Sequence, residues 1–290
     1  MTWLNAINDQ VAGIGAVVVT GTMRDSLHVL DVILNRDGGP APEMIATDTA
    51  SYSDIVFGLF RLLGYQFSPR VADMPDQRLW RLTPSGAPVA DYGIMGPVAK
   101  NKVSVNRMEP HWEDMLRVAG SLHNGAVAGY DLLRMLGRDG NPTPLGAAFA
   151  EYGRIAKTLH LLAMYDPDDE TYRRQIHVQL TTQESRHRLA RKIFYGQRGE
   201  LRQRYREGQE DQLGTLGLVL NAVILWNTRY IDAALNALRD KGYPVDDADV
   251  ARLSPLGDTH INVHGRYAFN SVQDDRLRPL RDPDSSSDDD

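Results

Sequence analysis

The sequence predicts an α/β protein that is mostly helical by residue count and builds a mixed or parallel sheet near its amino terminus. Short apolar runs typical of strands cover residues 11–20, 43–47 and 65–71. Helical patterns lie between them over residues 26–34 and 51–63, and helical spacing of apolar residues dominates the chain after residue 112. Strands that alternate with helices in this order usually form one sheet with helices packed on it.

Local signals support each of these elements. Three consecutive valines at 17–19 favour extended backbone, and the glycines and proline at 38–40 end the helix that follows. Ser51 or Ser53 is expected to cap the next helix. Later helical patterns cover residues 112–165, with a break at 137–144, then 170 onward and 181–238.

Composition places the chain among ordinary globular proteins. Of its 290 residues, 42% are hydrophobic and 24% are charged, which excludes a largely disordered chain, collagen or a coiled-coil rod. No run of eighteen apolar residues predicts a membrane span, and the first residues lack the pattern of a secretion signal. The absence of cysteine excludes disulfides and thiolate metal sites. We therefore expect a cytoplasmic protein with no membrane partner.

The net charge of −6 hides a basic segment. Five acidic residues fall within the last nine positions, whereas residues 184–210 contain eight basic and four acidic residues. This distribution leaves room for a polyanionic partner on one face. The alternative is a solvated helix, because Glu200, Glu207 and Glu210 interleave with the arginines and can form i,i+4 pairs.

Asp48 is the first candidate for chemistry. It follows the predicted strand 43–47, and the carboxyl ends of sheet strands are where α/β folds place their sites. The alternative is that Asp48 only turns or caps the chain into the next helix.

Glu184 is the second candidate. On a helix it shares one face with His187, Arg188, Arg191 and Tyr195, opposite an apolar face. The alternative is a capping box, in which Thr181 and Glu184 only close a helix start. The spacing of His260 and His264 is typical of metal ligands on a helix, but no third ligand lies nearby, so we interpret the pair as structural. The sequence contains no glycine-rich phosphate loop and no nucleophile elbow.

Several stretches together resemble the carboxyl-terminal domain of Tn-three-type transposases. They are GTMRDS at 21–26, TDTA at 47–50, FGLFRLLGYQFSPR at 57–70, QESRHRLAR at 183–191, GQRGEL at 196–201, RYREGQEDQLG at 204–214, LWNT at 225–228, LSPL at 253–256 and HIN at 260–262. The resemblance covers nearly the whole chain except its acidic tail, and the motifs are specific as a set.

The resemblance implies a ribonuclease-H-like catalytic core with a DDE acid triad and two Mg²⁺ ions that assist DNA cleavage and strand transfer. Asp48 matches the second acid and Glu184 the third, both as catalytic and metal-binding residues. The basic residues expected to bind DNA are Arg188, Arg191, Lys192, Arg198, Arg202 and Arg204. The partners implied are double-stranded DNA, as terminal inverted repeats and target DNA, and a second copy or a full-length transposase.

The chain also departs from the family pattern. Gln183 stands where the family usually has glycine. The first triad aspartate is expected on a strand upstream of Met1, since Asp9, Asp25 and Asp31 lie in the wrong elements to replace it. We therefore expect an incomplete ribonuclease-H-like sheet with an unpaired edge, and a chain that is inactive by itself.

The expected organisation has four parts. They are a partial sheet core over residues 1–83, a helical insertion over 84–180, the catalytic helix and helical carboxyl-terminal part over 181–282, and a disordered acidic tail over 283–290. The leading functional hypothesis is a transposase catalytic-domain fragment. The alternatives are a non-catalytic protein that binds DNA or titrates the full-length transposase, and an unrelated nuclease that uses Asp48 and Glu184 with another acid.

Overall fold

A computed structural model gives the fold of the chain. It describes residues 2–19, 25–36, 39–48, 52–72, 74–83, 91–137, 140–193, 204, 206–261, 277 and 280. The chain divides into two compact units, unit 1 (Met1–Gln183) and unit 2 (Glu184–Asp290), and each is described by itself. None of the described helices is both long and apolar enough to cross a membrane.

Within the described residues, unit 1 contains three separate two-stranded sheets. They are β1 (Thr2–Ile7) with β2 (Gly13–Val19), β3 (Met44–Ile45) with β4 (Gln66–Phe67), and β5 (Trp80–Arg81) with β6 (Asn101–Lys102). The first pair is antiparallel and the other two are parallel. The prediction of one mixed sheet is therefore not confirmed, because periodicity identifies a strand but not the partner with which it pairs.

The amino-terminal hairpin was missed by the sequence pattern. Residues 2–7 form β1, which pairs with β2 from Thr2 opposite Val19 to Ile7 opposite Gly13. In the turn, the side-chain oxygen of Asn8 accepts hydrogen bonds from the backbone N–H groups of residues 10 and 12. The strand predicted at 11–20 is thus β2, and it has β1 as a partner on one edge.

The other regular elements among the described residues of unit 1 are helices. Its short helices are η1 (Asp25–His28), α1 (Val29–Leu34), η2 (Met74–Asp76), η3 (Gly93–Met95), α3 (Val105–Met108) and η4 (Glu109–His111); its longer helices are α2 (Asp54–Leu62), α4 (Trp112–His123), α5 (Gly129–Gly137) and α6 (Pro144–Met164). The predicted break at 137–144 is confirmed. A second break, at 124–128, was not predicted, and Gly125 there has a positive φ of 68°.

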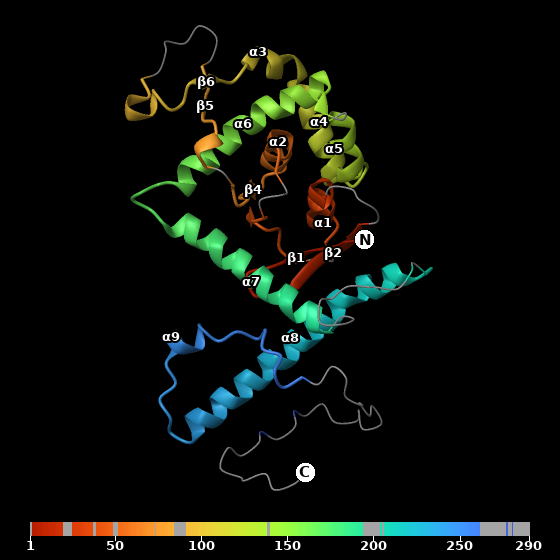
Figure 1. The fold of residues 1–290 in the computed structure, drawn as a ribbon, viewed down its shortest axis with the longest axis vertical. Helices are drawn as coiled ribbons and strands as arrows, with labels where there is room; N and C mark the ends of the chain where they lie inside the picture. The colour runs from red at the N-terminus through yellow and green to blue at the C-terminus, as the bar shows by residue number, and fades with distance from the viewer. Residues whose placement is uncertain are drawn as a thin grey trace. The chain divides into compact units, whose positions relative to one another are not determined.

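The core of unit 1 forms where α2 and α6 cross, with α4 and α5 beside them (Figure 1). Phe57, Phe60 and Phe149 are fully buried in it. Gly58 and Gly153 allow the two helices to meet, because a Cβ atom on either glycine would collide with the backbone of the other helix. The strands and helices that precede Asp48 and follow it are anchored on this crossing.

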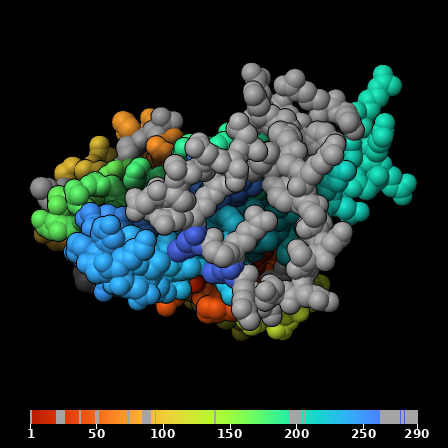
Figure 2. All heavy atoms as spheres, turned by 90° about the horizontal axis from the view of Figure 1, so that it is seen from below, coloured from red at the N-terminus to blue at the C-terminus, as the bar shows by residue number. Residues whose placement is uncertain are grey.

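Helix α7 (Thr171–Ile193) begins in unit 1 and ends in unit 2. Unit 2 also contains α8 (Gln209–Asp240) and α9 (Asp247–Val250). The buried stripe of α8 contains Leu216, Leu220 and Ile224 at four-residue spacing. Figure 2 shows the carboxyl-terminal half of α8 and α9, in blue, on the surface.

Candidate functional site

Asp48 lies three residues after β3, directly after Thr47, the last residue whose carbonyl group accepts a hydrogen bond from the β4 side. The parallel ladder with β4 is longer than the two strands themselves, because the backbone N–H groups of Gln66, Ser68 and Arg70 donate to the carbonyl groups of residues 43, 45 and 47 at 2.9, 2.8 and 2.8 Å. Asp48 is exposed at this end. The sequence prediction of an acid at the carboxyl end of a parallel strand is therefore confirmed in its local geometry.

Asp48 does not cap helix α2, so the capping half of the alternative interpretation is wrong; the turn half involves residues 49–51, which lie outside the described residues. Helix α2 begins at Asp54, and its cap is Ser53, whose hydroxyl oxygen accepts a hydrogen bond from the N–H of Val56 at 3.3 Å. Asp48 lies five residues before this cap. The sequence offered Ser51 and Ser53 as caps, and the structure selects Ser53.

Glu184 lies inside a helix, not at its start. Helix α7 begins at Thr171, and Thr181 sits in its interior with its hydroxyl donating to the carbonyl of His177 at 2.9 Å. The capping-box interpretation is therefore wrong. The amphipathic interpretation is confirmed for the described residues, because Leu189 and Ala190 are buried whereas Glu184 and Arg188 are exposed.

The predicted DNA-binding residues fall into three groups. Arg188 and Arg191 are exposed on α7, and Arg204 is exposed ahead of α8. Arg198 and Arg202 lie outside the described residues. Lys192 forms an ion pair with Asp258 at 2.5 Å between Nζ and Oδ2, a contact that the sequence did not indicate.

Arg186 interrupts the basic segment with a structural role. Its side chain is fully buried, and its guanidinium donates to the side-chain oxygen of Asn221 on α8 at 2.8 Å. Burial lowers the pKa of the Arg186 guanidinium to about 10, so the group stays cationic at neutral pH. Arg186 thus holds α7 against α8 within unit 2.

A second set of polar contacts in unit 2 connects α8 to residues 255–260. The buried amide of Asn227 donates to the carbonyl groups of Pro255 and Gly257 at 2.7 and 2.9 Å, and its oxygen lies 2.8 Å from Nε2 of His260. The His260 ring stacks on Trp226 with 5.2 Å between ring centroids. This confirms the structural interpretation of His260; His264 lies outside the described residues.

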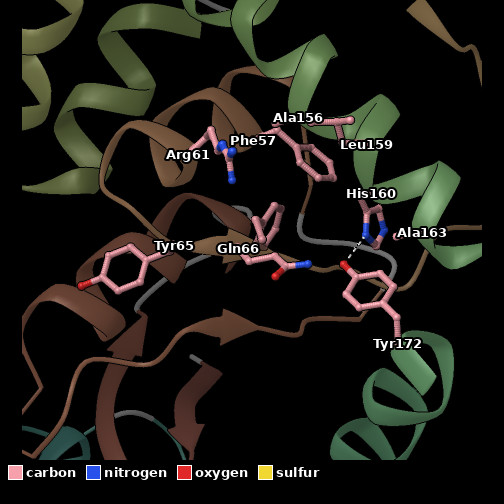
Figure 3. A pocket seen from close by; sticks show the side chains of 10 residues that line it. Phe57, Arg61, Tyr65, Gln66, Ala156, Leu159, His160, Ala163 and Tyr172 are labelled. Atoms are coloured by element: carbon pink, nitrogen blue, oxygen red, sulfur yellow. Dashed lines mark hydrogen bonds between the residues drawn. The ribbon is translucent and has the colours of Figure 1, made fainter.

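Unit 1 contains a pocket of about 280 Å³ whose wall includes a buried polar cluster (Figure 3). The lining residues are Phe57, Arg61, Tyr65, Gln66, Phe67, Ala156, Leu159, His160, Ala163 and Tyr172. We name the polar cluster the Tyr172 joint; it consists of Ser68, Pro69, His160 and Tyr172. The Tyr172 hydroxyl lies 2.6 Å from Oγ of Ser68 and 2.8 Å from Nδ1 of His160, and Nε2 of His160 lies 3.0 Å from the Pro69 carbonyl oxygen.

Electrostatics fix the charge of this joint. Burial lowers the pKa of the His160 imidazole to about 4, an effect that the Pro69 carbonyl only partly offsets, so the ring is neutral at neutral pH. Burial also raises the pKa of the Tyr172 hydroxyl, which stays protonated. No sequence motif indicated this joint, because its members are separated by up to 104 residues.

Of the acids considered as replacements for the first triad aspartate, Asp31 has a structural role. It lies in α1, and its carboxylate accepts hydrogen bonds from the N–H groups of Gly129 and Tyr130 at the start of α5. This contact satisfies helix-start donors. Asp9 is exposed in the β1–β2 turn, and the side chain of Asp25 is outside the described set.

These features define an α/β protein with an exposed acid at a parallel strand end and a second acid on an arginine-rich helix. Residues 1–267 match the model of the Tn3 transposase DDE domain, and the chain belongs to this family. It is 59% identical over 288 residues to the transposase for transposon Tn4556 of Streptomyces fradiae, covering 99% of this chain and 32% of that protein.

Two further relatives are also transposases. The transposase for transposon gamma-delta of Escherichia coli strain K12 is 49% identical over 274 residues, which is 94% of this chain and 27% of that protein. The transposase for transposon Tn21 of Escherichia coli is 37% identical over 283 residues, or 97% and 28%. The chain therefore spans about 30% of the length of these relatives. Membership of the family confirms the resemblance stated from the sequence motifs.

Proposed function

We propose that the chain supplies part of the catalytic domain of a DNA transposase, with Asp48 and Glu184 as the second and third acids of a DDE set. The activity is cleavage of a DNA strand at a transposon end and transfer of the freed 3′ end to target DNA. The observation that carries the proposal is the place of Glu184. It lies on the exposed face of α7 among arginines, where a capping role is excluded.

The family also implies a divalent metal ion. The carboxylate oxygens of Asp48 and Glu184 suit Mg²⁺ in kind, because that ion prefers hard oxygen ligands. They do not suffice in number, since the described part of the chain contains no group of three or more acidic or histidine side chains that could hold a metal.

The chain's own contribution is to present charge to DNA. The exposed guanidinium groups of Arg188, Arg191 and Arg204 suit bidentate contacts to phosphate oxygens. Such contacts position the duplex without reading its sequence. Arg198 and Arg202 belong to the same proposal on the strength of the family resemblance. Lys192 takes part only if its pair with Asp258 opens.

A chimera tests the proposal. This chain replaces the matching 288 residues of the Tn4556 transposase, and transposition is measured in cells together with strand cleavage on transposon-end DNA. We expect activity in the chimera and its loss to background in Asp48→Asn and Glu184→Gln. Matched controls are Glu43→Gln, an exposed acid at the other end of β3, and Glu170→Gln just before α7. Full activity of either acid variant contradicts the proposal.

The alternative function is binding without catalysis, either to DNA or to a full-length transposase that the chain titrates. The same chimera distinguishes the two. An inactive chimera that still binds duplex DNA with strong salt dependence favours the alternative. Co-purification of the 290-residue chain with the intact Tn4556 transposase, and lower transposition when both are expressed, supports titration.

We also propose that the 290-residue chain by itself neither nicks nor joins DNA in Mg²⁺ or Mn²⁺. Family resemblance identifies only two of the three triad acids among its residues. The measurement is incubation of the purified chain with labelled transposon-end substrates. Appearance of strand-transfer product overturns this part of the proposal.

A further inference from the structure

The donor and the acceptor of each hydrogen bond in the Tyr172 joint follow from the chemistry of its groups. A carbonyl oxygen only accepts, so Nε2 of His160 carries the hydrogen that it donates to Pro69. Because the ring is neutral, Nδ1 has no hydrogen and must accept from the Tyr172 hydroxyl. The Tyr172 oxygen in turn accepts from the hydroxyl of Ser68. Each polar atom of the joint therefore has a partner.

Because every polar atom of the Tyr172 joint already has a hydrogen-bond partner, the joint has a structural role. The polar groups that a ligand in the adjacent pocket would need from His160 and Tyr172 are already bonded to each other and to residues 68 and 69. Ser68 and His160 are also buried, with exposed fractions of 0% and 4%. A fully bonded, buried polar network rigidifies its surroundings. The joint is therefore a structural connection and not a ligand-binding group.

The joint connects three segments at one hydroxyl group. Ser68 and Pro69 directly follow β4, and the N–H of Ser68 donates to the carbonyl of Ile45 on the strand that leads to Asp48. His160 belongs to α6. Tyr172 is the second residue of α7. Figure 3 shows the His160 and Tyr172 side chains pointing toward one another at one end of the pocket.

We infer that Tyr172 is a positioning residue, whose hydroxyl fixes the first turn of α7 against the end of β4 and so fixes where the helix that carries Glu184 begins. This inference rests on the proposed function of Glu184. It assigns a role to a residue that is not one of the acids and that precedes Glu184 by twelve positions on α7.

A small change in the direction of a helix at its first turn displaces later residues by an amount that grows with their distance from that turn. Glu184 lies twelve residues after Tyr172 on the same helix, which corresponds to roughly 18 Å along its axis. A tilt of about 5° at the joint would displace that position by roughly 1.5 Å. A misplacement of about 1 Å in a catalytic group can cost on the order of a hundredfold in rate. Removing one hydroxyl can therefore affect catalysis without unfolding the protein.

The experiment uses the Tn4556 chimera with Tyr172→Phe, which removes the hydroxyl and keeps the ring. We expect the strand-cleavage rate at saturating DNA to fall roughly ten- to a hundredfold while the dissociation constant for DNA stays unchanged. Ser68→Ala, which leaves the hydrogen bond between Tyr172 and His160 in place, should reduce the rate less. The matched control is Tyr92→Phe, whose hydroxyl donates to the carbonyl of Leu82 at an exposed site.

A second readout does not depend on activity. In the 290-residue chain, Tyr172→Phe should raise amide hydrogen exchange over residues 171–176 and 66–70, whereas Tyr92→Phe should leave both segments unchanged. A normal cleavage rate in Tyr172→Phe, a loss of DNA affinity equal to the loss of rate, or unchanged exchange in both segments overturns the inference.

The acid variants separate this inference from the proposed function. If Asp48→Asn and Glu184→Gln abolish cleavage but Tyr172→Phe does not alter it, only the positioning role is wrong. If both acid variants retain the rate, the proposed function fails and the inference fails with it.

Discussion

Units 1 and 2 hold their helices in different ways. In unit 1, α2 and α6 approach so closely that glycine is required on both sides of the crossing. In unit 2, α8 leaves Leu218, Leu225 and Trp226 with exposed fractions of 73%, 61% and 44%. The strand leading to Asp48 therefore rests on dense packing. The helices of unit 2 depend more on individual polar contacts, such as those of Asn227.

The largest expected effect comes from adding one methyl group at the crossing in unit 1. Gly153→Ala places a Cβ atom against the carbonyl of Asp54, and α2 and α6 must separate to relieve the collision. We expect the free energy of unfolding to fall by about 3 kcal/mol or more, measured by urea denaturation. Gly120→Ala in α4 is the control, because no atom outside its own stretch of helix backbone lies within 4 Å of its added Cβ. Equal stability of Gly153→Ala and wild type would show that the crossing is loose.

The next effect is a pH dependence that belongs to the joint in unit 1. The pKa of His160 is about 4 in the folded chain and 6.5 when exposed, so the unfolded chain binds the extra proton between these values. The part of the free energy of unfolding that depends on His160 is therefore fully present above pH 6.5. It is lost as the pH falls toward 4, by about 3 kcal/mol in total. Lys157 contributes to the low pKa through its positive charge.

This pH dependence is isolated by difference. Urea denaturation of wild type and His160→Gln at pH 7, 6, 5 and 4 separates the contribution of His160 from that of carboxylates, which titrate in both proteins. We expect the stability gap between the two to shrink as the pH falls. A gap that stays constant from pH 7 to 4 would mean that His160 is not held neutral.

A smaller effect is expected for the exposed arginines of unit 2. The double variant Arg188→Ala with Arg191→Ala removes two proposed phosphate contacts. We expect roughly tenfold weaker duplex binding and a salt dependence whose slope falls by about 1 to 2, since each phosphate contact contributes about 0.9. Binding is measured by fluorescence polarisation at several salt concentrations. Arg252→Ala, which breaks only an exposed pair with Asp249, serves as the control and should leave the slope unchanged.

The smallest effect has the opposite sign to the first. The Cβ atom added by Gly214→Ala in α8 meets no atom within 4 Å outside its own stretch of helix backbone, and Gly214 is exposed inside the helix. Alanine has the higher helix propensity, so we expect a gain of about 0.5 to 1 kcal/mol in the free energy of unfolding. A loss comparable to that of Gly153→Ala would contradict the difference between the two units.

Sequence patterns identified the parts of this molecule that depend on local physics. The strand ending near Asp48, the cap before α2 and the amphipathic face of α7 follow from periodicity and helix-start chemistry. The same reasoning missed β1, because its identity as a strand depends on pairing with β2. It also placed a helix start near Thr181, since a capping box and a helix interior can share the same residue types.

The Tyr172 joint could not have been found in this way. Tyr172 and Ser68 are 104 residues apart, and neither carries a signal by itself. Likewise, Arg186 belongs by sequence to a basic segment, yet burial against Asn221 makes it structural. In both cases the partner of the polar group, and not its type, decides its role.

Motifs and periodicity were enough to identify the family, the two exposed acids and the amphipathic helix, because they are local properties of the chain. Which strands pair, which cations already have a partner and which hydroxyl anchors α7 became clear from the folded chain alone. These depend on contacts between distant residues, where packing and burial select one partner among many that the sequence allows.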